Sequence, residues 1–165
     1  MDAPDAALLF VRVAIGLTVA AHGIPKLKNL AGTAGWFDSI GMRPGAVHAR
    51  AAGGGEVLAG VFLAAGLLTP FAAFGVVALM VVAGWTSHRD NGFFIIREGW
   101  EYTFVLAVIA ITIAMLGSGE ISIDRVLGID TDLDGWLGGA IALGGGVTAG
   151  VVFLATFYRT PTPEE

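Results

Sequence analysis

Residues 8–28, LLFVRVAIGLTVAAHGIPKLK, form the first hydrophobic stretch of the chain and decide its fold. The stretch is long enough to cross a bilayer, because a membrane-spanning helix needs about 20 mostly apolar residues. It nevertheless carries Arg12 inside the apolar run and His22 near its end. An arginine at the bilayer centre costs ~2.5–3.5 kcal/mol on insertion scales, so Arg12 is expected to face protein rather than lipid. One side of the predicted helix carries Arg12, Gly16, Val19, Gly23 and Lys26. The two glycines on this side would let another helix come close.

The composition is that of an integral membrane protein. Of the 165 residues, 55% are hydrophobic and 14% are charged, whereas a soluble domain carries about 25% charged residues. The absence of cysteine excludes disulfides, thiolate metal sites and thiol chemistry within this chain. The net charge of −5 does not favour nucleic acid as a partner. Because the N-terminus is acidic, whereas a secretory signal begins with a basic region, we expect the first helix to be retained.

Hydropathy along the chain predicts an all-α fold, a polytopic membrane helix bundle with five transmembrane helices in one domain over residues 1–165. The expected spans cover about residues 6–24, 48–68, 69–85, 100–116 and 136–158. Pro25 is expected to end or kink the first helix, because it lacks an N–H group and clashes with the preceding turn. Thr69 is expected to cap the third span, with Pro70 in its first turn. The short apolar segments 35–42 and 91–96 should rest at the interface or against the bundle.

Basic residues gather on one side of this topology. That side carries Lys26, Lys28, Arg43, Arg50, Arg89, Arg97 and Arg159. The other side carries Arg125 with Asp2, Asp5, Glu120, Asp124, Asp130, Asp132 and Asp134. The positive-inside rule then predicts a multi-pass protein of the plasma membrane, with its N-terminus outside and its C-terminus cytoplasmic.

Ionisable residues within or next to the apolar spans indicate a candidate site. Glu56 is the expected partner of Arg12 because of its intermediate depth and small-residue helix face, and Glu101 is the second candidate. In a structural interpretation, such a pair neutralises both charges and locks the bundle. In a functional interpretation, Glu56, Glu101 and His22 line a polar cavity that exchanges protons and suits the head group of a quinone. The candidate ligand or proton site as a whole comprises Arg12, His22, Lys26, Glu56, Trp85, Trp100 and Glu101, and no catalytic residue is assigned.

Several of these features together resemble the DoxX family of small integral membrane proteins. The pattern comprises Arg12…Gly16…His22-Gly23…Lys26, Glu56 beside glycines, Asn91-Gly92-Phe93-Phe94, Glu101 and Gly117-Ser118-Gly119…Ile121-Ser122-Ile123-Asp124. The DoxX-like region covers residues 6–124, and the family has four membrane helices, so the span at 136–158 is an additional C-terminal helix. The resemblance implies a subunit of a membrane redox system. Some members are tied to thiosulfate oxidation with quinone reduction, and others to a complex with a sulfurtransferase and a superoxide dismutase.

A second candidate site lies between the fourth and fifth expected spans. Residues 130–135, DTDLDG, match the first six positions of a calcium-binding loop, but Ile141 stands where the bidentate glutamate is required. The segment is therefore not an EF-hand, and it provides only a weak calcium candidate, formed by Asp130, Asp132 and Asp134.

The resemblance to the DoxX family implies an accessory, non-catalytic subunit of an oxidoreductase complex rather than an enzyme on its own. Quinone is the one cofactor suggested, and the expected partners are membrane lipid and other protein subunits. Because the chain has no cysteine, any sulfur chemistry would occur on a partner protein. Two alternatives stay open: a small transporter or channel for a lipid or metabolite, and a purely structural assembly subunit. A co-purified quinone would favour the redox subunit, and a continuous polar path through the bundle would favour the transporter.

Overall fold

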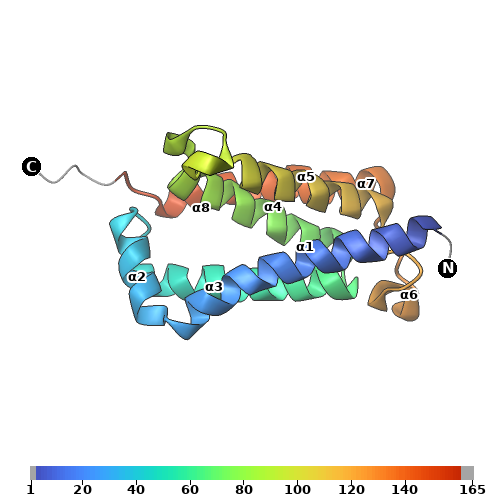
Figure 1. The fold of residues 1–165 in the computed structure, drawn as a ribbon. Coiled ribbons are helices and arrows are strands. Elements are labelled where there is room, and N and C mark those ends of the chain that lie inside the picture. The colour runs from blue at the N-terminus through green and yellow to red at the C-terminus, as the bar shows by residue number, and fades with distance from the viewer. Residues whose placement is uncertain (1–2, 161–165) are drawn as a thin grey trace, which may run out of the picture.

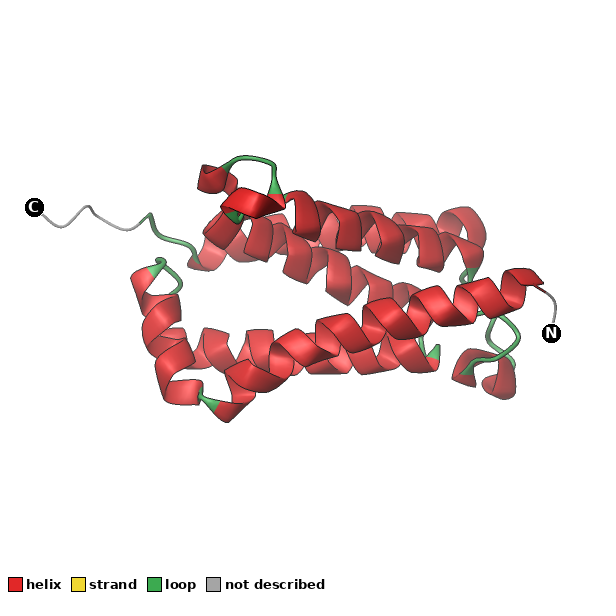
Figure 2. Ribbon diagram, viewed as in Figure 1, coloured by secondary structure: helices red, strands yellow, loops and turns green. Residues whose placement is uncertain are grey.

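The computed structural model describes residues 3–160, and this part of the chain is helical without any β-strand (Figure 2). The longer helices are α1 (Ala3–Lys28), α3 (Gly45–Ala65), α4 (Thr69–Ala83), α5 (Glu101–Leu116) and α8 (Gly146–Phe157). The shorter helices are α2 (Leu30–Ser39), α6 (Ile123–Leu127) and α7 (Gly135–Gly139). π-helical turns at Gly84–His88 and Ala140–Gly145 extend α4 and join α7 to α8, and 3₁₀ turns cover Arg89–Asn91 and Ile95–Arg97.

The helices pack in two groups. α1 runs antiparallel along α3, while α4 packs against both α5 and α8 (Figure 1). α2, the connection from α4 to α5 and the C-terminal end of α8 lie at one end of the bundle, and the N-terminal end of α1 lies with α6 at the other. We name the first the basic end, after Lys26, Lys28, Arg43, Arg50, Arg89, Arg97 and Arg159. We name the second the acidic end, after Asp5, Glu120, Asp124, Asp130, Asp132 and Asp134.

The length and apolar character of the helices identify a membrane protein. Within the described residues, three stretches are long and apolar enough to cross a bilayer: Ala3–Lys28, Thr69–Asn91 and Gly135–Phe157. Glu101–Leu116 is apolar but shorter. α3 is long, but it carries His48, Arg50 and Glu56, and it is not one of the three. The all-helical membrane fold is therefore confirmed, while five membrane crossings stay a prediction.

Three local predictions differ from the structure or are refined by it. α1 continues through Pro25 to Lys28, so the predicted end at residue 24 is wrong. A proline removes only one backbone donor, which membrane helices tolerate. Thr69 is the first residue of α4 and not its cap, because Asp124 takes the capping role. Residues 35–42 include the end of helix α2, which packs back against α3 and buries Phe37.

Small residues bring α1 and α3 into close contact. A methyl group added at Gly16 would lie 2.6 Å from the backbone nitrogen of Ala64, and one added at Gly60 would lie 2.5 Å from that of Ala20. Real Cβ atoms essentially never approach other heavy atoms this closely, so the two helix backbones meet without intervening side chains, as small residues allow in membranes. This contact fixes which residues of α1 and α3 lie at the same level.

Candidate functional site

The first group of predicted site residues lies where α1 contacts α3 and α5, towards the basic end. Lys26 Nζ lies 2.6 Å from Glu56 Oε2 and 2.8 Å from Oε1, so the ammonium contacts both carboxylate oxygens. The Glu56 side chain is 10% exposed and that of Lys26 is 24% exposed. A largely buried carboxylate requires such a partner, because an isolated charge in a medium of low dielectric constant is very costly.

His22 and Tyr102 extend this group. Tyr102 Oη lies 3.3 Å from His22 Nε2, within hydrogen-bonding distance, and the two rings tilt against each other with centroids 5.8 Å apart. Lys26 Nζ also donates to the backbone carbonyl of His22 at 3.2 Å. We call the four residues His22, Lys26, Glu56 and Tyr102 the polar cluster. His22 is exposed and Tyr102 is partly buried, so the cluster opens to the surface of the bundle.

Glu101 does not join the polar cluster. Its Oε2 accepts a hydrogen bond of 2.9 Å from the backbone N–H of Ile95, and its own N–H donates to the carbonyl of Phe93. The Glu101 side chain therefore stabilises the connection from α4 to α5 by a hydrogen bond to its backbone. The prediction that Glu101 lines one cavity with Glu56 is wrong, because the carboxylate folds back onto its own end of the helix.

Trp85 and Trp100 lie together elsewhere, on a groove bordered by α4, α5 and α8. Trp85 lies in the π-helical turn that follows α4, and Trp100 immediately precedes α5. The two residues are 48% and 38% exposed. The structure thus brings the two tryptophans to one site, but separates them from the polar cluster.

Arg12 lies near the acidic end and is 1% exposed. Its guanidinium donates hydrogen bonds to the backbone carbonyls of Ala64, Ser118 and Ile121. The predicted pairing with Glu56 is wrong for a geometric reason. Ala64 lies at the level of Arg12, and Glu56 is eight residues earlier on α3, about 12 Å away along the axis at 1.5 Å per residue.

The segment that receives Arg12 is organised by Asp124, a residue that the sequence did not single out as a site. The Asp124 carboxylate accepts hydrogen bonds from the backbone N–H groups of Leu68 (2.6 Å) and Thr69 (2.9 Å) and from the Thr69 hydroxyl (2.8 Å). The backbone N–H of Asp124 donates a hydrogen bond to the carbonyl of Gly66. Gly66 has a left-handed backbone with φ of 64°, which glycine adopts without strain, and a Cβ there would lie 2.7 Å from an Arg12 nitrogen. Asp124 is 3% exposed, so it stabilises the start of α4 from within the protein.

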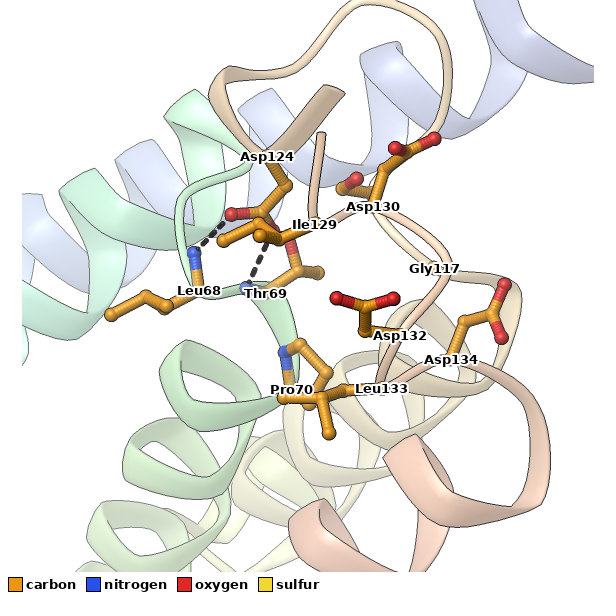
Figure 3. Close-up of a pocket in the computed structure, with 11 residues that line it drawn as sticks. Leu68, Thr69, Pro70, Gly117, Asp124, Ile129, Asp130, Asp132, Leu133 and Asp134 are labelled. Atoms are coloured by element: carbon orange, nitrogen blue, oxygen red, sulfur yellow. Dashed lines mark hydrogen bonds between the residues drawn. The ribbon is translucent and has the colours of Figure 1, made fainter. Parts of the chain in front are cut away.

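The calcium candidate lies beside this segment, next to a pocket of about 250 Å³. Arg125 pairs with Asp130 at 2.8 Å and with Glu120 at 3.2 Å, and the hydrogen bond to Asp130 raises the pKa of Arg125. Figure 3 shows the carboxylates of Asp130, Asp132 and Asp134 pointing in different directions. Among residues 3–160, no three histidine, aspartate or glutamate side chains are placed to hold a metal ion. The structure therefore gives no support to the calcium candidate.

Comparison with known proteins is consistent with the resemblance found in the sequence. A family model described as DoxX matches residues 7–89, a range that contains Arg12, His22, Lys26, Glu56 and Trp85. An uncharacterized protein of Haemophilus influenzae is 26% identical over 100 residues, which cover 56% of this chain and 66% of that protein's length. No solved structure matches. Because the family match extends over half of the chain, this helical membrane protein belongs to the DoxX family.

Proposed function

We propose that the protein is an accessory subunit of a redox complex in the plasma membrane, in which the polar cluster exchanges protons with a bound quinone. The observation that carries the proposal is that two side-chain pairs, Lys26–Glu56 and His22–Tyr102, bring ionisable groups of three helices together along one side of α1. Lys26 also donates to the backbone carbonyl of His22, which links the two pairs. Ionisable residues within membrane helices are expensive to bury and are by default a functional hypothesis.

The residues of the polar cluster fit a quinone head group. The imidazole of His22 and the hydroxyl of Tyr102 can each donate a hydrogen bond to a ring carbonyl, and both lie at the surface of the bundle, where a flat ring can reach them. Glu56 can accept or release a proton, and Lys26 compensates its charge. A bound quinone would supply two-electron redox chemistry that consumes and releases protons. The role of this chain would be to bind the ring and to exchange those protons.

The membrane orientation is part of the same proposal. An outer N-terminus and a cytoplasmic C-terminus are supported by the separation of the basic and acidic ends. The fifth span is supported by the length and apolar character of Gly135–Phe157. Single cysteines introduced at Thr33 and Thr131 should label from opposite sides of sealed membranes. Labelling of both from the same side would exclude this topology.

Photoaffinity labelling tests the quinone site directly. An azidoquinone added to the protein in lipid nanodiscs should crosslink to peptides of α1 and α5 around His22 and Tyr102. Tyr102→Phe combined with His22→Phe should abolish this labelling, because both donors are removed. Tyr158→Phe is the matched control, since it removes the hydroxyl of the other tyrosine of the chain. Unchanged labelling in the double variant would reject the site.

The subunit role needs a separate measurement. Gentle purification from native membranes, followed by mass spectrometry of the bound proteins, should recover oxidoreductase subunits with this chain. Recovery of the chain without any redox protein, even after chemical crosslinking in the membrane, would contradict the proposal.

A further inference from the structure

A groove bordered by α4, α5 and α8 lies apart from the polar cluster. Its volume is about 440 Å³. The lining is almost entirely apolar and comprises Val77, Met80, Val81, Gly84, Trp85, Arg89, Trp100, Thr103, Phe104, Ala107, Val108, Ile111, Leu143 and Val147. Arg89 is the only charged residue among them and lies at the basic end.

The length of the groove matches one leaflet of a bilayer. From Trp100 at the start of α5 to Ile111, the lining extends over about 16 Å at 1.5 Å per residue. The hydrocarbon core of a bilayer is about 30 Å thick, so the groove covers the depth of one leaflet. An acyl chain that enters from the basic end therefore fits along it, whereas a helix that crosses the whole membrane would extend well beyond it.

The lining favours a flexible chain over a second helix. Trp85, Trp100, Phe104 and Leu143 are large and between 38% and 51% exposed. Helices that associate in membranes use small residues so that their backbones can approach closely. Bulky side chains with a groove between them leave room for a hydrocarbon chain instead.

Arg89 gives the groove a charged entrance. Its guanidinium lies 4.3 Å from the Trp85 ring centroid and 5.8 Å from that of Tyr158, so aromatic rings hold it in place. Arg89 Nε forms an ion pair of 3.3 Å with Asp90, whose side chain is 87% exposed. Within residues 3–160, no hydrogen bond uses the two terminal nitrogens of Arg89, which leaves both as donors. A guanidinium with two free nitrogens suits bidentate contact with a phosphate.

We propose that the groove binds one anionic phospholipid from the leaflet at the basic end, with an acyl chain along α5 and its phosphate at Arg89. A zwitterionic headgroup would bring its own ammonium close to Arg89, and an anionic headgroup would not. Arg89 also covers the Trp85 ring face on which a quaternary ammonium would otherwise stack. This lipid site uses none of the residues of the polar cluster.

Native mass spectrometry of the protein released from nanodiscs of equal phosphatidylglycerol and phosphatidylcholine tests the proposal. The protein should retain one phosphatidylglycerol in preference to phosphatidylcholine. Arg89→Gln should lower the retained fraction about fivefold, the effect expected for one basic residue near an anionic surface. Arg50→Gln is the charge-matched control, because Arg50 is an exposed arginine of the basic end that does not line the groove.

The groove itself is tested by filling it. Val108 lines the groove and is 43% exposed, whereas Val105, on the same helix, is 44% exposed and lies outside it. Val108→Trp should displace the lipid, and Val105→Trp should leave it bound. If Val108→Trp fails to fold, the lipid retained by Arg89→Gln still tests the proposal. Three results would each overturn the proposal. The first is equal retention of the two lipids with no effect of Arg89→Gln, and the second is an equal effect of the two tryptophan variants. The third is a retained quinone in place of phospholipid.

Discussion

Replacing Arg12 with methionine should lower the free energy of unfolding by about 3–5 kcal/mol. A hydrogen bond to a charged group contributes ~1.5–3 kcal/mol net, and Arg12 makes three, to the carbonyls of Ser118, Ala64 and Ile121. Only the bond to Ser118 is fully buried, so we expect the full loss there and a partial loss at the other two, whose acceptors can regain water. For a chain of this length the change corresponds to a decrease in melting temperature of about 6–20 °C, measured in detergent or nanodiscs.

The identity of the partner is tested by double variants. Glu56 is bound to Lys26, so Arg12→Met combined with Glu56→Met should be no more stable than Arg12→Met alone. Lys26→Met combined with Glu56→Met should instead recover stability relative to Lys26→Met, because no unpaired charge stays buried. Arg12→Lys should lose part of the stability, since an ammonium cannot reproduce the planar fork of donors. Recovery of more than about 1 kcal/mol by adding Glu56→Met to Arg12→Met would refute the assignment of Arg12 to backbone carbonyls.

Two further predictions concern helix contacts. Gly60→Ala should destabilise the protein, because a methyl group has no room between α3 and α1, whereas Gly54→Ala on the same helix meets nothing within 4 Å and should be neutral or stabilising. Thermal denaturation of the two variants side by side measures the difference, and equal melting temperatures would contradict the close contact. Gly146→Leu should disrupt folding, because a Cβ there would lie 2.7 Å from a side chain of α4, whereas Gly144→Leu faces open space. On size exclusion, Gly146→Leu should give a lower yield of monodisperse protein than Gly144→Leu. Equal yields would contradict the close contact between α8 and α4.

The sequence predicted the class of the fold because hydropathy and charge act locally along the chain. The low charge content and the apolar runs identified membrane helices, and the helical segments of the structure lie close to the predicted spans. Gly16 and Gly23 were correctly expected at a helix contact, because small residues let helix backbones approach closely in a bilayer. Scattered motifs were enough to identify the DoxX family.

Only the tertiary structure decided which group satisfies each buried charge. Depth along separate helices suggested Glu56 for Arg12, but the register of α1 on α3 places Glu56 beside Lys26 instead. The partners of Arg12 are carbonyls, which every residue possesses, so no side-chain pattern could have indicated them. Asp124 was missed for a related reason, since its role depends on a turn more than 50 positions away in the chain. Local patterns determine which segments become membrane helices, whereas contacts between distant segments determine where their charges and hydrogen bonds are satisfied.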